Sequence, residues 1–138
     1  MSAAPAFASN KAHLQHVFAE TAKGNGRPFV EALDENVSWT IHGSTPWSKT
    51  YHGKKCVLDE PLGPLSRVLT PPLKLHAERM LAEGNSVCVE GRGENSSRSG
   101  RAYNNRYCWI FEFRDGRVIS ISEYMDTELV SAVLGGPT

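Results

Sequence analysis

The feature that most constrains the fold is a run of four strand-like segments between residues 73 and 126. They read LKLHAERMLAEG, SVCVEGRGEN, RAYNNRYCWIFEFRDG and RVISISEYMD, and turn-forming residues separate each segment from the next. Asp115-Gly116 is the strongest hairpin signal in the chain, because this pair suits the positive φ angles of a two-residue turn. Connections this short favour an antiparallel meander over parallel pairing.

Helical patterns come before the meander. In residues 9–26 the apolar positions follow the i, i+3, i+4, i+7 spacing of a half-buried helix, with Ser9 or Asn10 as its cap. A shorter helix is expected to begin at Arg27-Pro28, because proline suits a first helical turn. The next segment, NVSWTIHG at residues 36–43, alternates as a strand does.

The remaining segments complete an α+β pattern. Residues 44–53 are predicted to form a loop, and residues 54–69 have helical spacing that Pro61 and Pro64 should break into two short pieces. Residues 127–136 predict a terminal helix. Helices followed by a meander are typical of an α+β fold in which a curled antiparallel sheet packs on the early helices. A length of 138 residues predicts one domain over 1–138, with a structured core of about 10–134.

Composition excludes several classes of function. Acidic and basic residues balance at 15 each, which argues against a nucleic-acid or anionic-membrane partner. No apolar run reaches the length of a membrane span, and MSAAPAFASN lacks the pattern of a secretory signal. Cys56, Cys88 and Cys108 are widely spaced and odd in number, which fits reduced thiols better than disulfides or zinc ligands. We therefore predict a cytoplasmic protein with no metal site.

Two segments carry a resemblance to a known family. They are VSWTIHGSTPWSKTYHGK and YNNRYCWIFEFRDGRVISISEYMDT, which occur in this order after a pair of helices. Over about residues 10–134 the chain resembles the SnoaL-like and ketosteroid-isomerase-like branch of the nuclear transport factor two superfamily. The resemblance implies a cone-shaped α+β roll with a deep cavity, a homodimer, and a small lipophilic ligand handled without a cofactor. This superfamily includes isomerases, polyketide cyclases, limonene-type epoxide hydrolases and non-catalytic members, so the fold alone does not assign an activity.

The resemblance to ketosteroid isomerases implies which residues of the first strand face the cavity. By that alignment Ser38, Thr40 and His42 share the inward face. Thr40 stands where the isomerases have a general-base aspartate, and a threonine cannot take a proton from carbon near neutral pH. Trp109 and His16 stand near the positions of the isomerase acid and tyrosine. Steroid isomerisation is therefore rejected, while the fold is kept.

The resemblance to epoxide hydrolases implies a set of catalytic residues. Glu90 and Arg92 fall at the family's Arg-x-Asp pair with the charges in reversed order, and Glu123 falls at its second aspartate. These three residues are the predicted catalytic group. Arg92 would hold one carboxylate ionised, while the other, less paired and more buried, would keep its proton. Such a site could run acid and base steps together at neutral pH.

The predicted substrate-binding residues surround this group. Tyr107 and Trp109 would form a flat apolar wall, as binding cavities often have, and Ser38 and Thr40 fall at positions that help hold a water in the epoxide hydrolases. The full predicted set is Ser38, Thr40, His42, Asn105, Tyr107, Trp109 and His16.

Alternatives remain open at two levels. Glu90 and Arg92 would be a solvated pair of little energetic value on an exposed strand, or part of a buried but purely structural network. The leading function is cofactor-free acid/base chemistry on a lipophilic substrate, by hydrolysis, isomerisation or cyclisation. The competing function is a non-catalytic ligand-binding or dimerisation module of the same fold.

Overall fold

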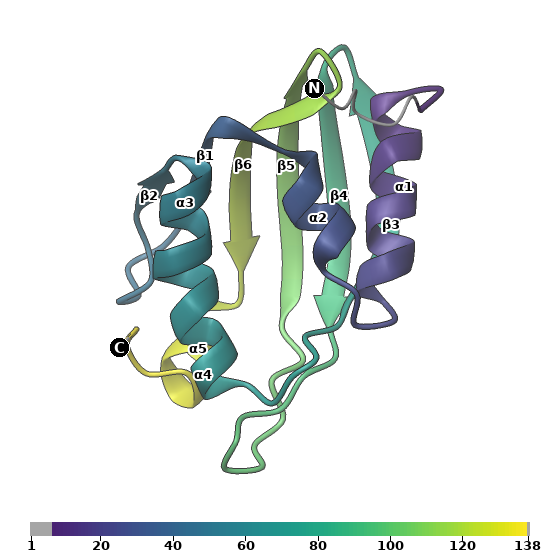
Figure 1. Ribbon diagram of the computed structural model, residues 1–138. Coiled ribbons are helices and arrows are strands. Elements are labelled where there is room, and N and C mark those ends of the chain that lie inside the picture. Colours follow the sequence, from purple (N-terminus) through teal and green to yellow (C-terminus); the bar gives the residue numbers. More distant parts are fainter. Residues whose placement is uncertain (1–6, 138) are drawn as a thin grey trace.

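The computed structural model describes residues 7–137 and contains one six-stranded sheet with helices packed on it. Residues 1–6, part of the segment read above for a secretory signal, lie outside the described residues. The sheet order is β2-β1-β6-β5-β4-β3 (Figure 1). The elements are α1 (Asn10–Thr21), α2 (Arg27–Ala32), β1 (Leu33–Ile41), β2 (Thr50–His52), α3 (Lys54–Val57), η1 (Leu58–Leu62), α4 (Gly63–Val68), β3 (Leu75–Glu83), β4 (Ser86–Gly93), β5 (Arg106–Arg114), β6 (Arg117–Met125) and α5 (Thr127–Val133).

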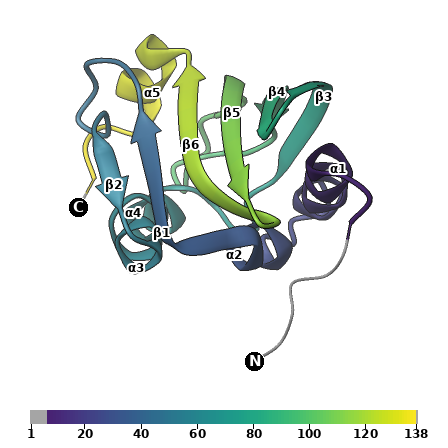
Figure 2. The same ribbon diagram turned by 90° about the horizontal axis from the view of Figure 1, so that it is seen from above.

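The predicted meander is confirmed, and one strand makes the sheet mixed. Strands β3 to β6 pair antiparallel in sequence order, whereas β1 pairs in parallel with β6 and antiparallel with β2. The sheet is strongly curved, and α1, α2 and α3 lie along the side toward which it curls (Figure 2). The architecture is therefore an α+β cone, as expected.

Helix α1 follows its sequence signals closely. The Ser9 hydroxyl caps it by accepting a hydrogen bond from the Ala12 backbone N–H at 3.0 Å. The Thr21 hydroxyl, at the last turn, donates to the Leu75 carbonyl at 2.8 Å and so ties α1 to β3. The predicted apolar stripe is buried: Leu14, Val17, Phe18 and Thr21.

Two local predictions differ from the structure. Residues 54–68 form three successive helical pieces without a gap, because the chain widens into a π-helical turn at Leu58–Leu62 that accommodates Pro61. The prediction of two broken pieces is wrong in this respect. The predicted loop 44–53 contains β2, whose Tyr51 pairs with Trp39 and is 2% exposed.

The two turns at the ends of β5 differ in kind. Asp115 and Gly116 both have positive φ, 51° and 77°, as the predicted tight hairpin requires. At the other end β5 begins at Arg106, because residues 94–105 form a longer excursion closed by a bridge between Ser96 and Ala102. This excursion brings Tyr103 into the interior.

The hydrophobic core lies on the inner face of the sheet. Phe111 of β5 contacts Phe18 of α1 and Phe29 of α2 edge-on, at ring-centre distances of 6.1 and 6.4 Å. Alternate residues of the central strands join this core: Val37, Trp39, Ile41, Val87, Val89, Trp109, Phe111, Phe113 and Ile121. This alternation fixes which side of each strand can face an internal cavity.

Candidate functional site

A cavity of about 240 Å³ lies between the inner face of the sheet and the helices. Strands β1, β5 and β6 form one wall, α2 and the Lys54–Val68 helical stretch form another, and α5 contributes to its lining. The lining is mostly aliphatic and aromatic, which is typical of sites for lipophilic ligands. Its polar members are Thr21, Ser66, Asn95, Tyr103, Tyr107 and Glu123, together with the indoles of Trp39, Trp47 and Trp109.

Glu123 supplies the ionisable carboxyl of this cavity. It lies on β6 directly opposite Trp109 of β5, and the Trp109 indole Nε1–H donates to Glu123 Oε1 at 2.7 Å. Burial raises the pKa of Glu123 to about 7, and the hydrogen bond from Trp109 opposes part of that rise. The carboxyl can therefore exist in either protonation state near neutral pH.

The second carboxyl oxygen of Glu123 is uncommitted. Within residues 7–137, no group donates a hydrogen bond to Oε2. This oxygen is also not among the fully buried polar atoms that lack a partner, so it is accessible from the cavity side. Since Glu123 lines the cavity, Oε2 is free to exchange a proton with a bound molecule.

Tyr107 and Trp109 form an aromatic wall beside this carboxyl. Their rings stack at 4.6 Å with 13° between the planes, and both residues line the cavity. Burial raises the pKa of Tyr107 well above its ordinary value, so its hydroxyl remains neutral. The expected flat wall is present, while its role in substrate binding stays a prediction.

Asn105 is fully buried next to the cavity rather than in its lining. Its Oδ1 accepts from the backbone N–H groups of Arg106 and Asp126, at 2.7 and 3.0 Å. Its Nδ2 donates to the Asp126 carbonyl and to the Tyr103 hydroxyl, both at 3.1 Å. All its polar positions are used within the protein, so Asn105 supports Tyr103 rather than presenting a free group to a ligand.

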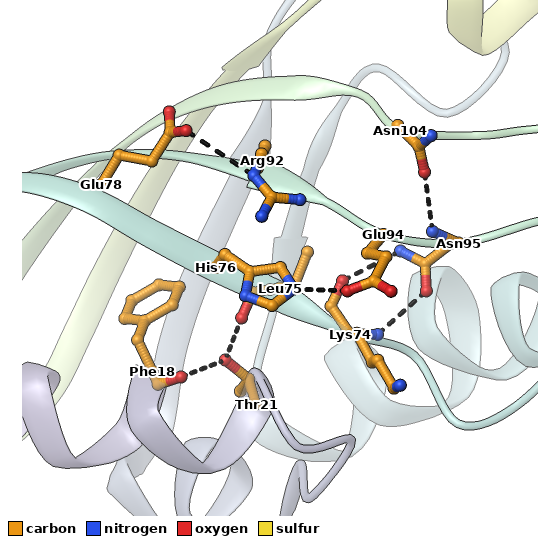
Figure 3. A network of polar contacts seen from close by, with 10 residues as sticks. All are labelled: Phe18, Thr21, Lys74, Leu75, His76, Glu78, Arg92, Glu94, Asn95 and Asn104. Atoms are coloured by element: carbon orange, nitrogen blue, oxygen red, sulfur yellow. Dashed lines mark hydrogen bonds and ion pairs between the residues drawn. The ribbon is translucent and has the colours of Figure 1, made fainter.

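The expectation that Glu90 and Arg92 face the cavity is wrong. Glu90 is 54% exposed and lies 3.5 Å from Arg79 Nε on β3, while Arg92 is 43% exposed and lies 3.6 Å from Glu78. Figure 3 shows Arg92 directed toward Glu78 within the network of polar contacts around β3 and β4. The predicted group of three converging ionisable side chains therefore does not form.

Strand register explains this orientation. Val89 pairs with Trp109, and Val87 pairs with Phe111. Because paired residues share a face, the two aromatic side chains and the two valines all point inward, where each is at most 3% exposed. The intervening Glu90 must then point outward.

The inward orientation predicted for the first strand is also wrong. Ser38, Thr40 and His42 lie on the outer face, where the Thr40 hydroxyl bonds the Thr50 hydroxyl at 2.8 Å and His42 stacks on Tyr124 at 4.1 Å. The apolar residues Val37, Trp39 and Ile41 take the inner positions, because burying them removes far more apolar surface from water.

His16 is likewise outside the cavity. It is exposed on α1 and its ring lies 5.5 Å from that of Phe7. The alignment that placed it in the site fails because Val17 and Phe18, rather than His16, occupy the buried side of this helix.

Sequence reasoning missed two polar groups near the cavity. Trp39 lines the cavity, and its Nε1 is buried without a hydrogen-bond partner among the described residues. Tyr103 was not singled out, because it lies outside any strand, where periodicity does not predict the direction of a side chain. For Trp39 the alternation of Val37, Trp39 and Ile41 was a usable signal.

Within residues 7–137, no three His, Cys, Asp or Glu side chains gather in a way that could hold a metal ion. In the same range, no helix is both long and apolar enough to span a bilayer.

The cavity, the curved sheet and the order of elements agree with a family match. The model of the SnoaL-like domain family matches residues 14–121, which is most of the chain. The chain belongs to this SnoaL-like family. A search of curated protein sequences gives no match. The resemblance stated from the sequence is therefore confirmed at the level of family and fold.

Solved structures similar to this SnoaL-like chain share its fold at low sequence identity. An NTF2-like protein of unknown function from Burkholderia pseudomallei is 16% identical, with 93% of this chain and 98% of that one covered and a TM-score of 0.79. A candidate SnoaL-like polyketide cyclase from Jannaschia sp. CCS1 is 17% identical, with coverages of 100% and 99% and a TM-score of 0.74. TerC, crystallised with polyporic acid, is 18% identical, with coverages of 91% and 97% and a TM-score of 0.76.

Proposed function

We propose that this protein binds a small lipophilic organic molecule in its internal cavity and catalyses a cofactor-free proton transfer there, with Glu123 as the acid/base group. The observation that carries this proposal is the buried Glu123 carboxyl, which has one oxygen held by Trp109 and the other free in an apolar cavity. A pKa of about 7 suits both removal and return of a proton near neutral pH.

The reaction classes that fit are isomerisation and cyclisation. In an isomerisation, ionised Glu123 takes a proton from carbon and the same carboxyl returns it to another atom of the ligand. In a cyclisation, the carbanion formed by that first step attacks a carbonyl carbon of the same molecule, and Glu123 returns the proton to the new alkoxide oxygen. Both sequences leave the carboxyl as it began.

Hydrolysis fits less well with the arrangement of charges. Activating a water while protonating a leaving oxygen calls for two cooperating groups, as the predicted Glu90, Arg92 and Glu123 would have been. Because Glu90 and Arg92 lie on the outer face, neither of them can act together with Glu123 on a bound molecule. We therefore place hydrolysis behind proton transfer.

The comparisons support the same reaction classes. Similar structures include the candidate polyketide cyclase and a candidate isomerase from Bacillus subtilis, the latter 22% identical with a TM-score of 0.73. TerC was crystallised with polyporic acid, an organic small molecule. These folds are compatible with cavity chemistry on a lipophilic compound, and the substrate of this chain is a matter for experiment.

A second candidate function is a non-catalytic binding module. The observation that favours it is the scarcity of reactive groups in the cavity, where Glu123 is the one carboxyl among otherwise apolar, aromatic and neutral polar lining residues of the described chain. In this case Glu123 would orient a ligand by hydrogen bonding and transfer no proton.

An isotope-exchange experiment separates the two candidates without knowledge of the natural substrate. A panel of lipophilic ketones and enones is incubated with the protein in D₂O, and deuterium incorporation at carbon is followed by mass spectrometry. We expect exchange with at least one compound, lost in Glu123→Gln and retained in the control Glu35→Gln, an exposed carboxyl on β1. Equal exchange in Glu123→Gln would refute the catalytic role, and binding without exchange would favour the module.

The predicted homodimer and cytoplasmic location remain proposals. Exposed Tyr124 (45%) and Leu81 (56%) give the outer face of the sheet apolar surface suited to a second copy. His42 beside Tyr124 has a buried ring nitrogen without a partner among the described residues. Sedimentation equilibrium tests the proposed homodimer. A monomer at all concentrations would contradict it, and Tyr124→Asp should weaken a dimer that uses this face.

A further inference from the structure

Two thiols meet on the outer face of the sheet, away from the cavity. The sulfur atoms of Cys88 on β4 and Cys108 on β5 lie 3.5 Å apart, and both side chains are half-buried. Cys88 stands between the inward-pointing Val87 and Val89, so it points outward. Neither cysteine lines the cavity, and α1, α2 and α3 lie on the other side of the sheet (Figure 2). A reagent can therefore reach the pair from solvent without entering the cavity.

The strand register keeps the two sulfurs from joining directly. Cys88 pairs with Ile110 and Cys108 pairs with Glu90, so the cysteines are diagonal neighbours rather than opposite each other. Diagonal neighbours are typically about 7–8 Å apart, which exceeds the span of most disulfides. A direct S–S bond of about 2.05 Å would therefore require the strands to move. A third atom bonded to both sulfurs would span the observed gap with the strands in place.

The width of the gap selects the bridging atom. With bonds of about 2.3 Å to each sulfur, a gap of 3.5 Å corresponds to an angle of about 100° at that atom. A soft cation with linear coordination would need the sulfurs about 4.6 Å apart at the same bond length. Tetrahedral Zn²⁺ would need further ligands, and within residues 7–137 no third His, Cys, Asp or Glu gathers with this pair. Trivalent arsenic is pyramidal and bonds two thiols at an angle close to the required one.

The charges around the pair favour the same ligand. Burial is the main cause that raises the pKa of Cys108 to about 11, and Cys88 and the charge of Glu90 add to this rise. The surroundings therefore disfavour two thiolates. A monovalent cation held by two thiolates would leave a net negative charge beside Glu90, whereas an arsenic atom bonded to both sulfurs leaves the pair neutral.

We propose that Cys88 and Cys108 form a dithiol site on the outer face of the sheet that binds trivalent organoarsenicals of the type R–As=O. In this step two As–S bonds form and the As=O bond breaks. The two thiol protons leave with the oxygen as one water molecule, and no atom is oxidised or reduced. The site lies apart from Glu123, so it goes beyond the proposed function and does not depend on it.

Phenylarsine oxide is the probe, and intact-mass spectrometry measures its capture. We expect one adduct per chain, with the mass of the reagent less one water. The adduct should resist the monothiol β-mercaptoethanol, because two bonds hold the arsenic, and should be removed by dithiothreitol.

Single substitutions test the need for both sulfurs. Cys88→Ser and Cys108→Ser each keep one thiol of the pair, so their affinity for the arsenical, measured by competition with β-mercaptoethanol, should be about 10²–10⁴-fold lower. The matched control is Cys56→Ser, which removes a thiol that donates to Glu60 at 3.0 Å in the Lys54–Val68 helical stretch. This control should bind the probe as the wild type does.

Protection from alkylation locates the site in the unaltered chain, so the test does not depend on the folding of a variant. Prolonged labelling with N-ethylmaleimide, followed by peptide mapping, should find all three cysteines modified in the untreated protein. In the arsenical-treated protein, Cys56 should be modified while Cys88 and Cys108 are protected.

The proposed homodimer would cover this face, so each measurement is repeated on Tyr124→Asp, which should weaken that dimer. Tyr124 pairs with Cys108 across β5 and β6. An adduct in either protein that resists β-mercaptoethanol and protects the pair supports the site. No such adduct in either protein, or an adduct that both single serine variants retain, would overturn it. Deuterium exchange tests Glu123 separately, so its failure leaves the dithiol site standing.

Discussion

Replacing Glu123 with Gln should change the pH dependence of folding stability by about 2.5 kcal/mol between pH 5 and pH 8. Burial raises the pKa of Glu123 from its ordinary value of 4.5 to about 7. The folded protein therefore holds this proton over a range where the unfolded chain has lost it. The stability that this proton gives is complete below pH 4.5 and is lost as the pH rises through 7. Glutamine stays neutral, so Glu123→Gln lacks this loss.

Urea unfolding at a series of pH values measures the effect. The free energy of unfolding of the wild type should fall relative to that of Glu123→Gln as the pH rises, whereas Glu35→Gln should run parallel to the wild type. Burial also lowers the pKa of His13, but that contribution is common to all three proteins and cancels in the differences. Parallel curves for the wild type and Glu123→Gln would refute a buried carboxyl with a raised pKa.

Three further substitutions and one control variant test the geometry. Trp109→Phe removes the hydrogen bond that lowers the pKa of Glu123, so a ¹³C NMR titration should find this pKa higher than in the wild type, and an unchanged or lower value would contradict the contact. Gly91→Ala would place a Cβ 2.3 Å from a carbonyl oxygen of β3 and should destabilise the fold by about 1–3 kcal/mol, whereas Gly26→Ala meets open space and should change little in thermal unfolding. Arg92→Ala should cost under about 1 kcal/mol in urea unfolding, because its ion pair is half exposed, and a larger loss would show that the pair is not a surface contact.

The sequence predicted the fold well because its strongest signals are local. The spacing of Leu14, Val17 and Phe18 on α1 depends only on neighbours in the chain, as does the Asp115-Gly116 turn. The parallel pairing of β1 with β6 was not predicted, since no local pattern reports a contact between strands some eighty residues apart. The π-helical turn around Pro61 was not predicted either, because the helix widens locally at this proline instead of ending.

The candidate site could be predicted only in part, for the same physical reason. Glu123, which the resemblance to epoxide hydrolases implied, lies in the cavity, and it shares the inner face of its strand with buried Ile121. Glu90 was misplaced because an alignment was given priority over the simple alternation of Val87 and Val89, which requires Glu90 to face outward. Tyr103 could not be found by any periodic pattern, because its position depends on the path of an irregular excursion and on the hydrogen bonds of Asn105.

The loss of Arg92 from the site changes the chemistry that Glu123 can perform. A guanidinium beside the carboxyl would stabilise the charged form and lower its pKa, leaving a weak base. Without that cation, burial dominates and raises the pKa toward neutrality, where a carboxylate is a stronger base and its acid form is still present. The ion pair of Arg92 on the outer face and the acid/base capacity of Glu123 inside are thus two results of one strand register. A variant that brought a cation next to Glu123, such as Ile41→Lys on the neighbouring strand, should lower the pKa of Glu123 and shift any exchange activity to lower pH.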